Sequence, residues 1–281
     1  MSQSAVSIID RAGELDSLKF MSVSTRKLCS LLQDDNCPTT EIAKLISSDP
    51  ILAARILKLI NSAFYGFPHR ISTITQAVVL LGTNVIKGLV LSASILEKMT
   101  QSMAGLFEHS LACSIACAMI ARRIGLSDPE QAQIAGLLHD FGKVVLASEF
   151  KPEFNKVLAL SREQNISFYE AEMIVFDQVS HCEIADCLFE KWKLPPRLRN
   201  SILYHHRPHR AGQYSDSAAL VQLGDMLARV SGLGFGGDVW VPDVRNDWFR
   251  EFDLDYKALD ELLEEYHHSI LNLDMDFLVE P

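Results

Sequence analysis

The sequence has few of the features that mark secreted proteins. Its six cysteines form no CxxC pair and show no spacing that indicates a disulfide framework. The N-terminal segment MSQSAVSIIDRAGELD lacks the continuous apolar stretch of a secretory leader. We therefore expect a reduced, cytoplasmic protein.

Positive charge and long apolar runs are also scarce. The chain has 36 acidic and 26 basic residues and a formal net charge of −10, whereas non-specific nucleic-acid binders are normally basic overall. A nucleic-acid partner is therefore not expected, although a local basic patch stays open. The most apolar region, residues 77–96, is interrupted by Gly82, Thr83, Asn84 and Lys87. A membrane span requires an uninterrupted stretch of that length, so no membrane contact is expected.

The alternating patterns of β-strands are nearly absent, and apolar residues recur at helical spacing instead. The predicted fold class is therefore all-α. A chain of 281 residues exceeds the usual size of one domain, which indicates one large domain or two closely packed ones. We predict an N-terminal helical lobe at residues 1–100, opening with a loose lead-in, and a second helical lobe at residues 101–231. A connector and a C-terminal helix that packs on the second lobe account for residues 232–281.

The most informative stretch is residues 136–143, GLLHDFGK. An apolar stripe at i, i+3, i+4 and i+7 predicts a helix with one buried face: Ile134, Leu137, Leu138 and Phe141. Gly142 offers the left-handed residue that commonly ends a helix. Such a helix would present His139 and Asp140 at the edge of a core. An imidazole and a carboxylate are both good ligands for Zn, Mn or Fe.

Other candidate ligands lie on both sides of this pair in the chain: His109, His181, His205, His206 and Asp225. Each of these residues alone is more often a helix cap or a surface residue than a ligand. Ser180 and Glu183 have the spacing of a capping box, which predicts that His181 lies in the first turn of a helix. The glycine-rich residues 232–237 follow a helix and lack a Lys-Ser/Thr pair, so we interpret them as a flexible connector.

Three sequence blocks in the first lobe resemble the HDOD family in order and spacing: LISSDP (residues 45–50), LKLINSAFYG (57–66) and ISTITQAVVLLG (71–82). The resemblance runs from about Leu18 to Val230. That family is a signalling relative of the HD phosphohydrolases and of the HD-GYP cyclic di-GMP phosphodiesterases. The resemblance implies a two-lobed helical bundle. We interpret residues 61–66 as a helix end with an aromatic plug rather than a ligand site.

The same resemblance implies a divalent metal centre with one or two ions of Fe, Mn or Zn. HD phosphohydrolases use the order His, His-Asp, Asp for one metal, which corresponds here to His109, His139-Asp140 and Asp225. HD-GYP proteins add histidines between these for a second metal, as His181 and His205 or His206 would. Asp140 could bridge the two ions. Lys143 follows the pair in the order seen in HD enzymes, where it would meet phosphate; it could equally be a helix C-terminal lysine.

One departure from the HD-GYP pattern bears on the substrate. The residues that follow His205 and His206 read RPHRAGQYS, which does not contain the Gly-Tyr-Pro motif. Cyclic di-GMP hydrolysis is therefore the less expected activity.

Two functions remain. The first is a regulatory module that acts through unknown signalling protein partners and retains the metal site. The alternative is a metal-dependent phosphohydrolase acting on a phosphorylated small molecule or nucleotide, with Asp140 and Lys143 as catalytic residues.

Overall fold

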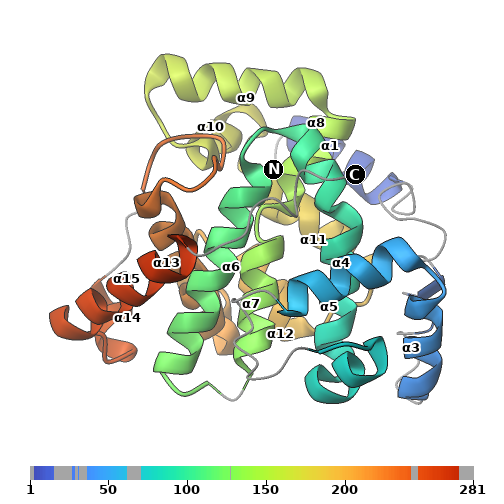
Figure 1. Cartoon of the computed structure of the whole chain (residues 1–281). Helices are drawn as coiled ribbons and strands as arrows, with labels where there is room; N and C mark the ends of the chain where they lie inside the picture. The colour runs from blue at the N-terminus through green and yellow to red at the C-terminus, as the bar shows by residue number, and fades with distance from the viewer. Residues whose placement is uncertain are drawn as a thin grey trace. The chain divides into compact units, whose positions relative to one another are not determined.

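The computed structural model describes residues 3–15, 27–28, 31, 37–61, 71–126, 128–241 and 246–271. All regular secondary structure in these residues is helical, so the predicted all-α fold class is confirmed (Figure 1). The chain divides into two compact units by its contacts. One unit contains residues 1–17 and 96–256, and the other contains residues 18–95 and 257–281.

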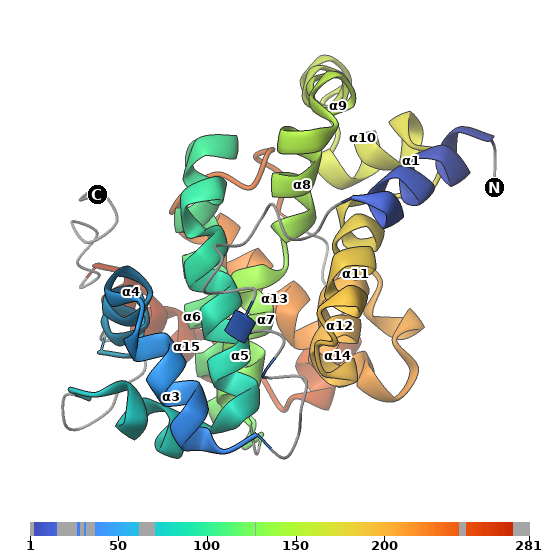
Figure 2. The same ribbon diagram turned by 90° about the vertical axis from the view of Figure 1, so that its right-hand side faces the viewer.

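This grouping differs from the predicted division at both ends of the chain. The predicted loose lead-in contains helix α1 (Gln3–Glu14), which packs on α11 (His181–Lys191) in the unit of residues 96–256 (Figure 2). Arg11 forms an ion pair with Glu153 at 3.2 Å. Helix α15 (Tyr256–Leu271) is grouped from Lys257 onward with residues 18–95.

In the unit of residues 18–95, α3 (Thr39–Ser47) packs on α4 (Pro50–Asn61). The Asp49-Pro50 start signal is confirmed, because α4 begins at Pro50 and the Asp49 side chain accepts a hydrogen bond from the Leu52 N–H at 3.0 Å. The Asn61 amide bonds the backbone N–H and C=O of Ile71, at 2.7 Å each. These bonds give Asn61 a structural role at the helix end. The rest of the aromatic block, residues 62–66, lies outside the described residues.

Helix α5 (Ile74–Ser102) runs across the boundary between the two units and is broken at Gly82, whose φ of 75° is not helical. The sequence predicted a helix end at this glycine. Within the described residues, none of the helices combines the length and the apolar character needed to cross a bilayer.

The unit of residues 96–256 is built around α6 (Leu106–Arg123), which is buried along most of its length and packs against α7 (Pro129–Leu138) and α13 (Ser215–Ser231). Besides these helices, α1, α11 and the end of α5, this unit contains α8 (Phe141–Glu149), α9 (Lys151–Gln164), α10 (Phe168–Val175), α12 (Pro196–Leu203), η2 (Pro208–Arg210), η3 (Gly212–Tyr214) and α14 (Asn246–Glu251). Because α6 is enclosed by its neighbours, the polar side chains that it carries lie inside the protein.

Candidate metal centre

His139 and Asp140 form the turn between α7 and α8, since α7 ends at Leu138 and α8 begins at Phe141. The predicted helix end is therefore present. Gly142 does not have the left-handed conformation expected of it and instead lies inside α8. A Cβ at Gly142 would lie 1.8 Å from the carbonyl oxygen of His181. Glycine is needed here because α8 and the first turn of α11 approach each other too closely for any side chain.

His109, His139 and Asp225 form a first donor group, which we call the Asp225 cluster; one ligand atom of each lies within 4.8 Å of the others. They come from α6, the α7–α8 turn and α13. The Nε2 atom of His109 lies 3.0 Å from Oδ1 of Asp225, and Nε2 of His139 lies 3.8 Å from the same oxygen. These three helical elements thus deliver two imidazoles and one carboxylate to one point.

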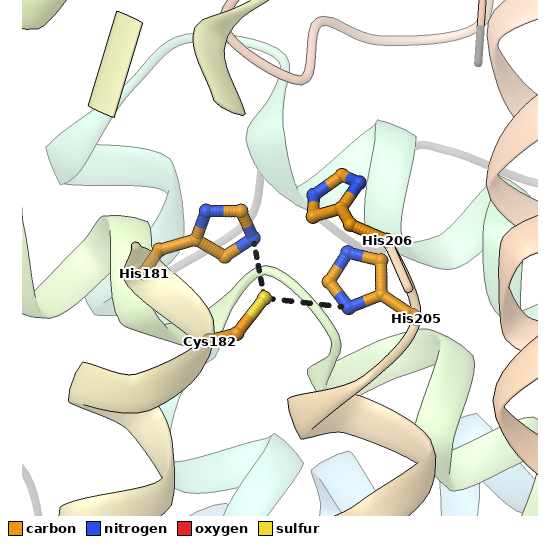
Figure 3. A group of neighbouring side chains, drawn as sticks. All are labelled: His181, Cys182, His205 and His206. Atoms are coloured by element: carbon orange, nitrogen blue, oxygen red, sulfur yellow. Dashed lines mark hydrogen bonds between the residues drawn. The ribbon is translucent and has the colours of Figure 1, made fainter. Parts of the chain in front are cut away.

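A second group, the Cys182 cluster, contains His181, Cys182, His205 and His206 (Figure 3). His181 and Cys182 open α11, and the capping box predicted for Ser180 and Glu183 is confirmed. The two histidines follow α12. Figure 3 shows the four side chains pointing toward one another. The Cys182 Sγ lies 3.5 Å from Nε2 of His181 and 3.7 Å from Nδ1 of His205.

Asp140 lies between the two clusters. Its Oδ2 is 3.3 Å from Nε2 of His139 and 3.5 Å from Nε2 of His109, whereas its Oδ1 is 3.2 Å from Nε2 of His181. Lys143 also donates a hydrogen bond to Oδ2 at 2.8 Å. One carboxylate therefore faces histidines of both clusters, each with a different oxygen.

Three of the histidines have their Nδ1 atoms held by an acceptor. Nδ1 lies 2.7 Å from the Gly136 carbonyl in His139, 2.7 Å from the Ile202 carbonyl in His205, and 2.7 Å from the Glu172 carboxylate in His181. These oxygens only accept hydrogen bonds, so each Nδ1 is the donor. Metal-binding histidines characteristically donate their second ring N–H to a carbonyl or a carboxylate in this way. The Nε2 atom of each ring is then the one available as a ligand.

Several of the donor atoms have no hydrogen-bond partner among the described residues although they are buried: Nε2 of His109, His139, His205 and His206, and Oδ1 of Asp140. Buried polar atoms are normally satisfied, and an unsatisfied one calls for an explanation such as a missing ion. Here electron-rich nitrogen and oxygen atoms face each other at 3.0–3.8 Å, which is favourable only with a proton or a metal ion between them. The residues therefore fit a divalent metal.

The pKa values show which protonation states these buried groups adopt when no metal is bound. Burial would lower the pKa of His139, but the Asp140 carboxylate and Cys113 together outweigh burial and hold that pKa well above its ordinary value. Burial lowers the pKa of His205 to about 3, and His139 and His181 add to the effect. Burial would raise the pKa of Asp225, yet Arg229 and His109 hold it well below its ordinary value. His205 is thus neutral and Asp225 ionised at neutral pH, which are the forms that bind metals.

The glycine-rich segment, residues 232–240, lies against the Asp225 cluster and is not a free connector (the orange trace between α13 and α14 in Figure 1). The Gly236 carbonyl accepts a hydrogen bond from Lys143 at 2.8 Å. Asp238 accepts from the backbone N–H of Phe168 and from Arg229, at 2.8 Å each. Arg229 in turn bonds both oxygens of Asp225, at 2.9 and 3.1 Å. This segment, which we call the covering segment, closes the site.

All seven residues predicted as metal ligands lie in the two clusters or between them, and Lys143 reaches Asp140 rather than an open surface. His205 and His206 both lie in the Cys182 cluster. His209, His267 and His268 are exposed, as expected.

Glu172, Cys182 and Arg229 were not among the residues predicted for the site. Glu172 had a detectable signal, because it stands at i+4 between Phe168 and Phe176 on the buried face of α10, where a carboxylate needs a partner. Arg229 stands at i+4 from Asp225 on α13, the spacing of an ion pair. Cys182 had no signal beyond its position next to His181.

Fold and site together define an all-helical domain with a buried His/Asp centre suited to a divalent metal. The sequence model of the HDOD domain matches residues 18–208, more than half of the chain, and the protein belongs to this family. An HDOD domain protein of unknown function from Geobacter sulfurreducens is 27% identical, with a TM-score of 0.68, and the match covers 95% of this chain and 96% of that one.

Two further relatives extend the comparison. A proposed phosphohydrolase from Shewanella amazonensis shares the fold, with 20% identity, a TM-score of 0.70 and 99% coverage of both chains. An uncharacterized protein of Treponema pallidum (strain Nichols) is 28% identical over 234 residues, which are 80% of this chain and 44% of the relative. The chain thus spans less than half the length of that relative.

Proposed function

We propose that this protein is an HDOD-type signal-transduction module that retains an HD-type divalent metal site in its interior and acts through contacts with signalling proteins. The metal, one or two ions of Fe, Mn or Zn, is held by His109, His139, Asp140, His181, His205, His206 and Asp225. In this proposal the metal fixes the arrangement of the helices that carry its ligands.

The observation that carries the proposal is the closure of the site. As whole residues, Asp140, Lys143 and five of the other ligand residues are at most 1% exposed: His109, His139, His181, His205 and Asp225. A hydrolase must bring a phosphoryl group and a water molecule to its metal. Here the covering segment lies against the Asp225 cluster, in the position that a phosphoryl group and a water molecule would need. The cavity of about 150 Å³ beside α7, α12 and α13 contains none of the ligand residues.

Lys143 supports the same conclusion. Its ammonium group donates to the Asp140 carboxylate and to the Gly236 carbonyl, at 2.8 Å each. A lysine used to bind phosphate as a point charge would keep its ammonium group free for the substrate. In this protein it connects the His-Asp turn to the covering segment, which is a structural role.

The alternative is a metal-dependent phosphohydrolase with Asp140 and Lys143 as catalytic residues, acting on a phosphomonoester or a nucleotide. One observation favours it: the ligand set of the HD enzymes is complete and converges. A bound divalent metal would supply Lewis-acid polarisation of a phosphoryl oxygen and a bound water of lowered pKa. For this activity the covering segment would have to move away from His109 and Lys143.

The test compares wild type with Asp140→Ala, both purified without added metal and without nickel resin. We expect one or two equivalents of Fe, Mn or Zn in wild type, a large loss in the variant, and no phosphate release from p-nitrophenyl phosphate or nucleoside phosphates by either. Asp186→Ala is the matched control, because Asp186 pairs with Arg199 away from the clusters.

Two outcomes would contradict the proposal. Phosphate release that disappears in both His139→Ala and Asp140→Ala would establish the enzyme instead. A folded wild-type protein without metal would leave the histidines as structural polar residues and remove the metal from the proposal.

A further inference from the structure

We infer that Cys182 is a metal ligand and that it makes the Cys182 cluster a closed zinc site with one thiolate and three imidazole ligands. This inference rests on the proposed interior metal site and deepens it. It adds a ligand and assigns a metal, where the ligand order of the HD enzymes predicts only histidines around a second ion of unspecified identity.

The donor atoms of the Cys182 cluster have the spacing of a zinc site. Zn–S bonds of about 2.3 Å and Zn–N bonds of about 2.0–2.1 Å at a tetrahedral angle place sulfur and nitrogen about 3.6 Å apart. The Cys182 Sγ and the His181 Nε2 are 3.5 Å apart. One ligand atom from each of the four residues lies within 4.8 Å of all the others, so a single ion can be reached by all four.

Two ring nitrogens of the Cys182 cluster lack a hydrogen-bond partner among the described residues. The thiol of Cys182 has one hydrogen to donate, which can satisfy one ring nitrogen at most. The Nε2 atoms of His205 and His206 are both buried and have no hydrogen-bond partner among the described residues. The Nδ1–H of His181 is used by Glu172, so its Nε2 presents a lone pair to the same point. A metal ion would satisfy the nitrogens of His181 and His206 and the sulfur together. His205 faces the sulfur with Nδ1, which lies 3.7 Å from Sγ and 2.7 Å from the Ile202 carbonyl, so it would join them after a turn of its ring.

The donor atoms of the Cys182 cluster are of the softer kind that zinc prefers. A thiolate with three imidazoles is a donor set that suits zinc, and four protein ligands without an open position are typical of structural rather than catalytic zinc. The Asp225 cluster contains a carboxylate and no sulfur, and its chemistry suits Mn or Fe as well. Asp140 Oδ1 also faces His181 Nε2 at 3.2 Å, and Asp140 and His139 form a further donor group with His205, so these residues could compete with Cys182 for this ion.

Cobalt provides the direct test, because Co²⁺ replaces zinc and a thiolate ligand gives it an intense near-ultraviolet charge-transfer band. The full chain is stripped with chelator and titrated with Co²⁺ as wild type, Cys182→Ser and Cys187→Ser. Cys187 lies five positions further on in α11 and outside the cluster, which makes it the matched control. We expect the band in wild type and Cys187→Ser and its loss in Cys182→Ser, with zinc content reduced by one equivalent.

A second measurement does not depend on the variant folding. X-ray absorption of zinc-loaded wild type should show a sulfur neighbour at about 2.3 Å. Zinc surrounded by nitrogen and oxygen only, or a charge-transfer band that persists in Cys182→Ser, would overturn the inference while leaving the regulatory module intact. Phosphate release by a protein whose zinc does carry sulfur would overturn the module and leave this inference standing.

Discussion

The Asp225 cluster and the Cys182 cluster lie on either side of one carboxylate, yet they are built differently. The Asp225 cluster gathers single residues from three distant parts of the chain, and its carboxylate is paired with Arg229. The Cys182 cluster consists of two pairs of adjacent residues and contains no carboxylate. Glu172 accepts a hydrogen bond from Nδ1 of His181, on the side of the ring that faces away from the cluster. The comparison shows that a single interior can hold a group of donor atoms with a carboxylate and a group with a thiol close together. The predictions below test whether the two clusters are as independent as this difference suggests.

The largest effect is expected from Gly142→Ala, which should damage both clusters. The new Cβ would lie 1.8 Å from the backbone carbonyl of His181, and neither helix can yield without moving ligands. We expect the free energy of unfolding to fall by more than about 4 kcal/mol, measured by urea denaturation. In Gly13→Ala, where a Cβ meets nothing within 4 Å, we expect no loss, or a gain of about 0.5–1 kcal/mol. Equal stability of the two variants would contradict the packing described here.

Lys143→Met should separate the metal-free protein from the metal-loaded one. Without the ammonium group, the buried Asp140 carboxylate loses one cationic hydrogen-bond donor and keeps His139, so we expect a cost of about 1.5–3 kcal/mol in the metal-free state. A bound divalent ion supplies the missing charge, so metal should raise the Tm of this variant more than that of wild type.

Calorimetry with and without chelator measures this difference. Lys257→Met removes a lysine whose pair with Glu261 is exposed, and should change stability by less than about 0.5 kcal/mol. An equal loss in the presence and absence of metal would show that Lys143 and the metal do not share Asp140.

Glu172→Gln should weaken the Cys182 cluster alone. The carboxylate orients His181 and increases its basicity, and removing such a partner typically costs about 10–100-fold in metal affinity. Competition titrations with a chromophoric chelator measure the affinity at each cluster. Glu170→Gln on the same helix is the control, because glutamine preserves the capping box with Ser167. A comparable loss at the Asp225 cluster would indicate that the clusters are coupled.

The smallest effect is expected from Gly236→Ala, and it should fall on the Asp225 cluster. The added Cβ would lie 3.0 Å from Nε2 of His109 and 3.0 Å from Nη2 of Arg229, which are ends of side chains and can shift. We expect a loss of stability of about 1 kcal/mol and a modest loss of metal affinity at His109. Unchanged affinity at the Asp225 cluster would show that the covering segment does not confine its ligands.

Much of the local structure follows directly from the sequence. Asp49-Pro50 and the Ser180–Glu183 box mark helix starts because their hydrogen bonds close within three residues. The position of His139 and Asp140 at a helix end follows from the apolar stripe that precedes them. The histidines and aspartates follow the order of the HD enzymes, and this resemblance implied which residues would meet. The helix starts and the helix end depend only on the spacing of residues that are neighbours in the sequence.

The closure of the site and the composition of its second cluster were decided only by tertiary structure. The sequence around Gly142 predicts a helix end. The contact with the His181 carbonyl, which explains this glycine, cannot be predicted from the sequence. The composition of the glycine-rich segment predicts a connector. Its contact with the site depends on the hydrogen bond between Gly236 and Lys143, which are 93 positions apart in the sequence. Cys182 and Glu172 gain their roles from side chains on other helices. Contacts of this kind depend on how buried faces pack, and the pattern of one segment does not contain that information.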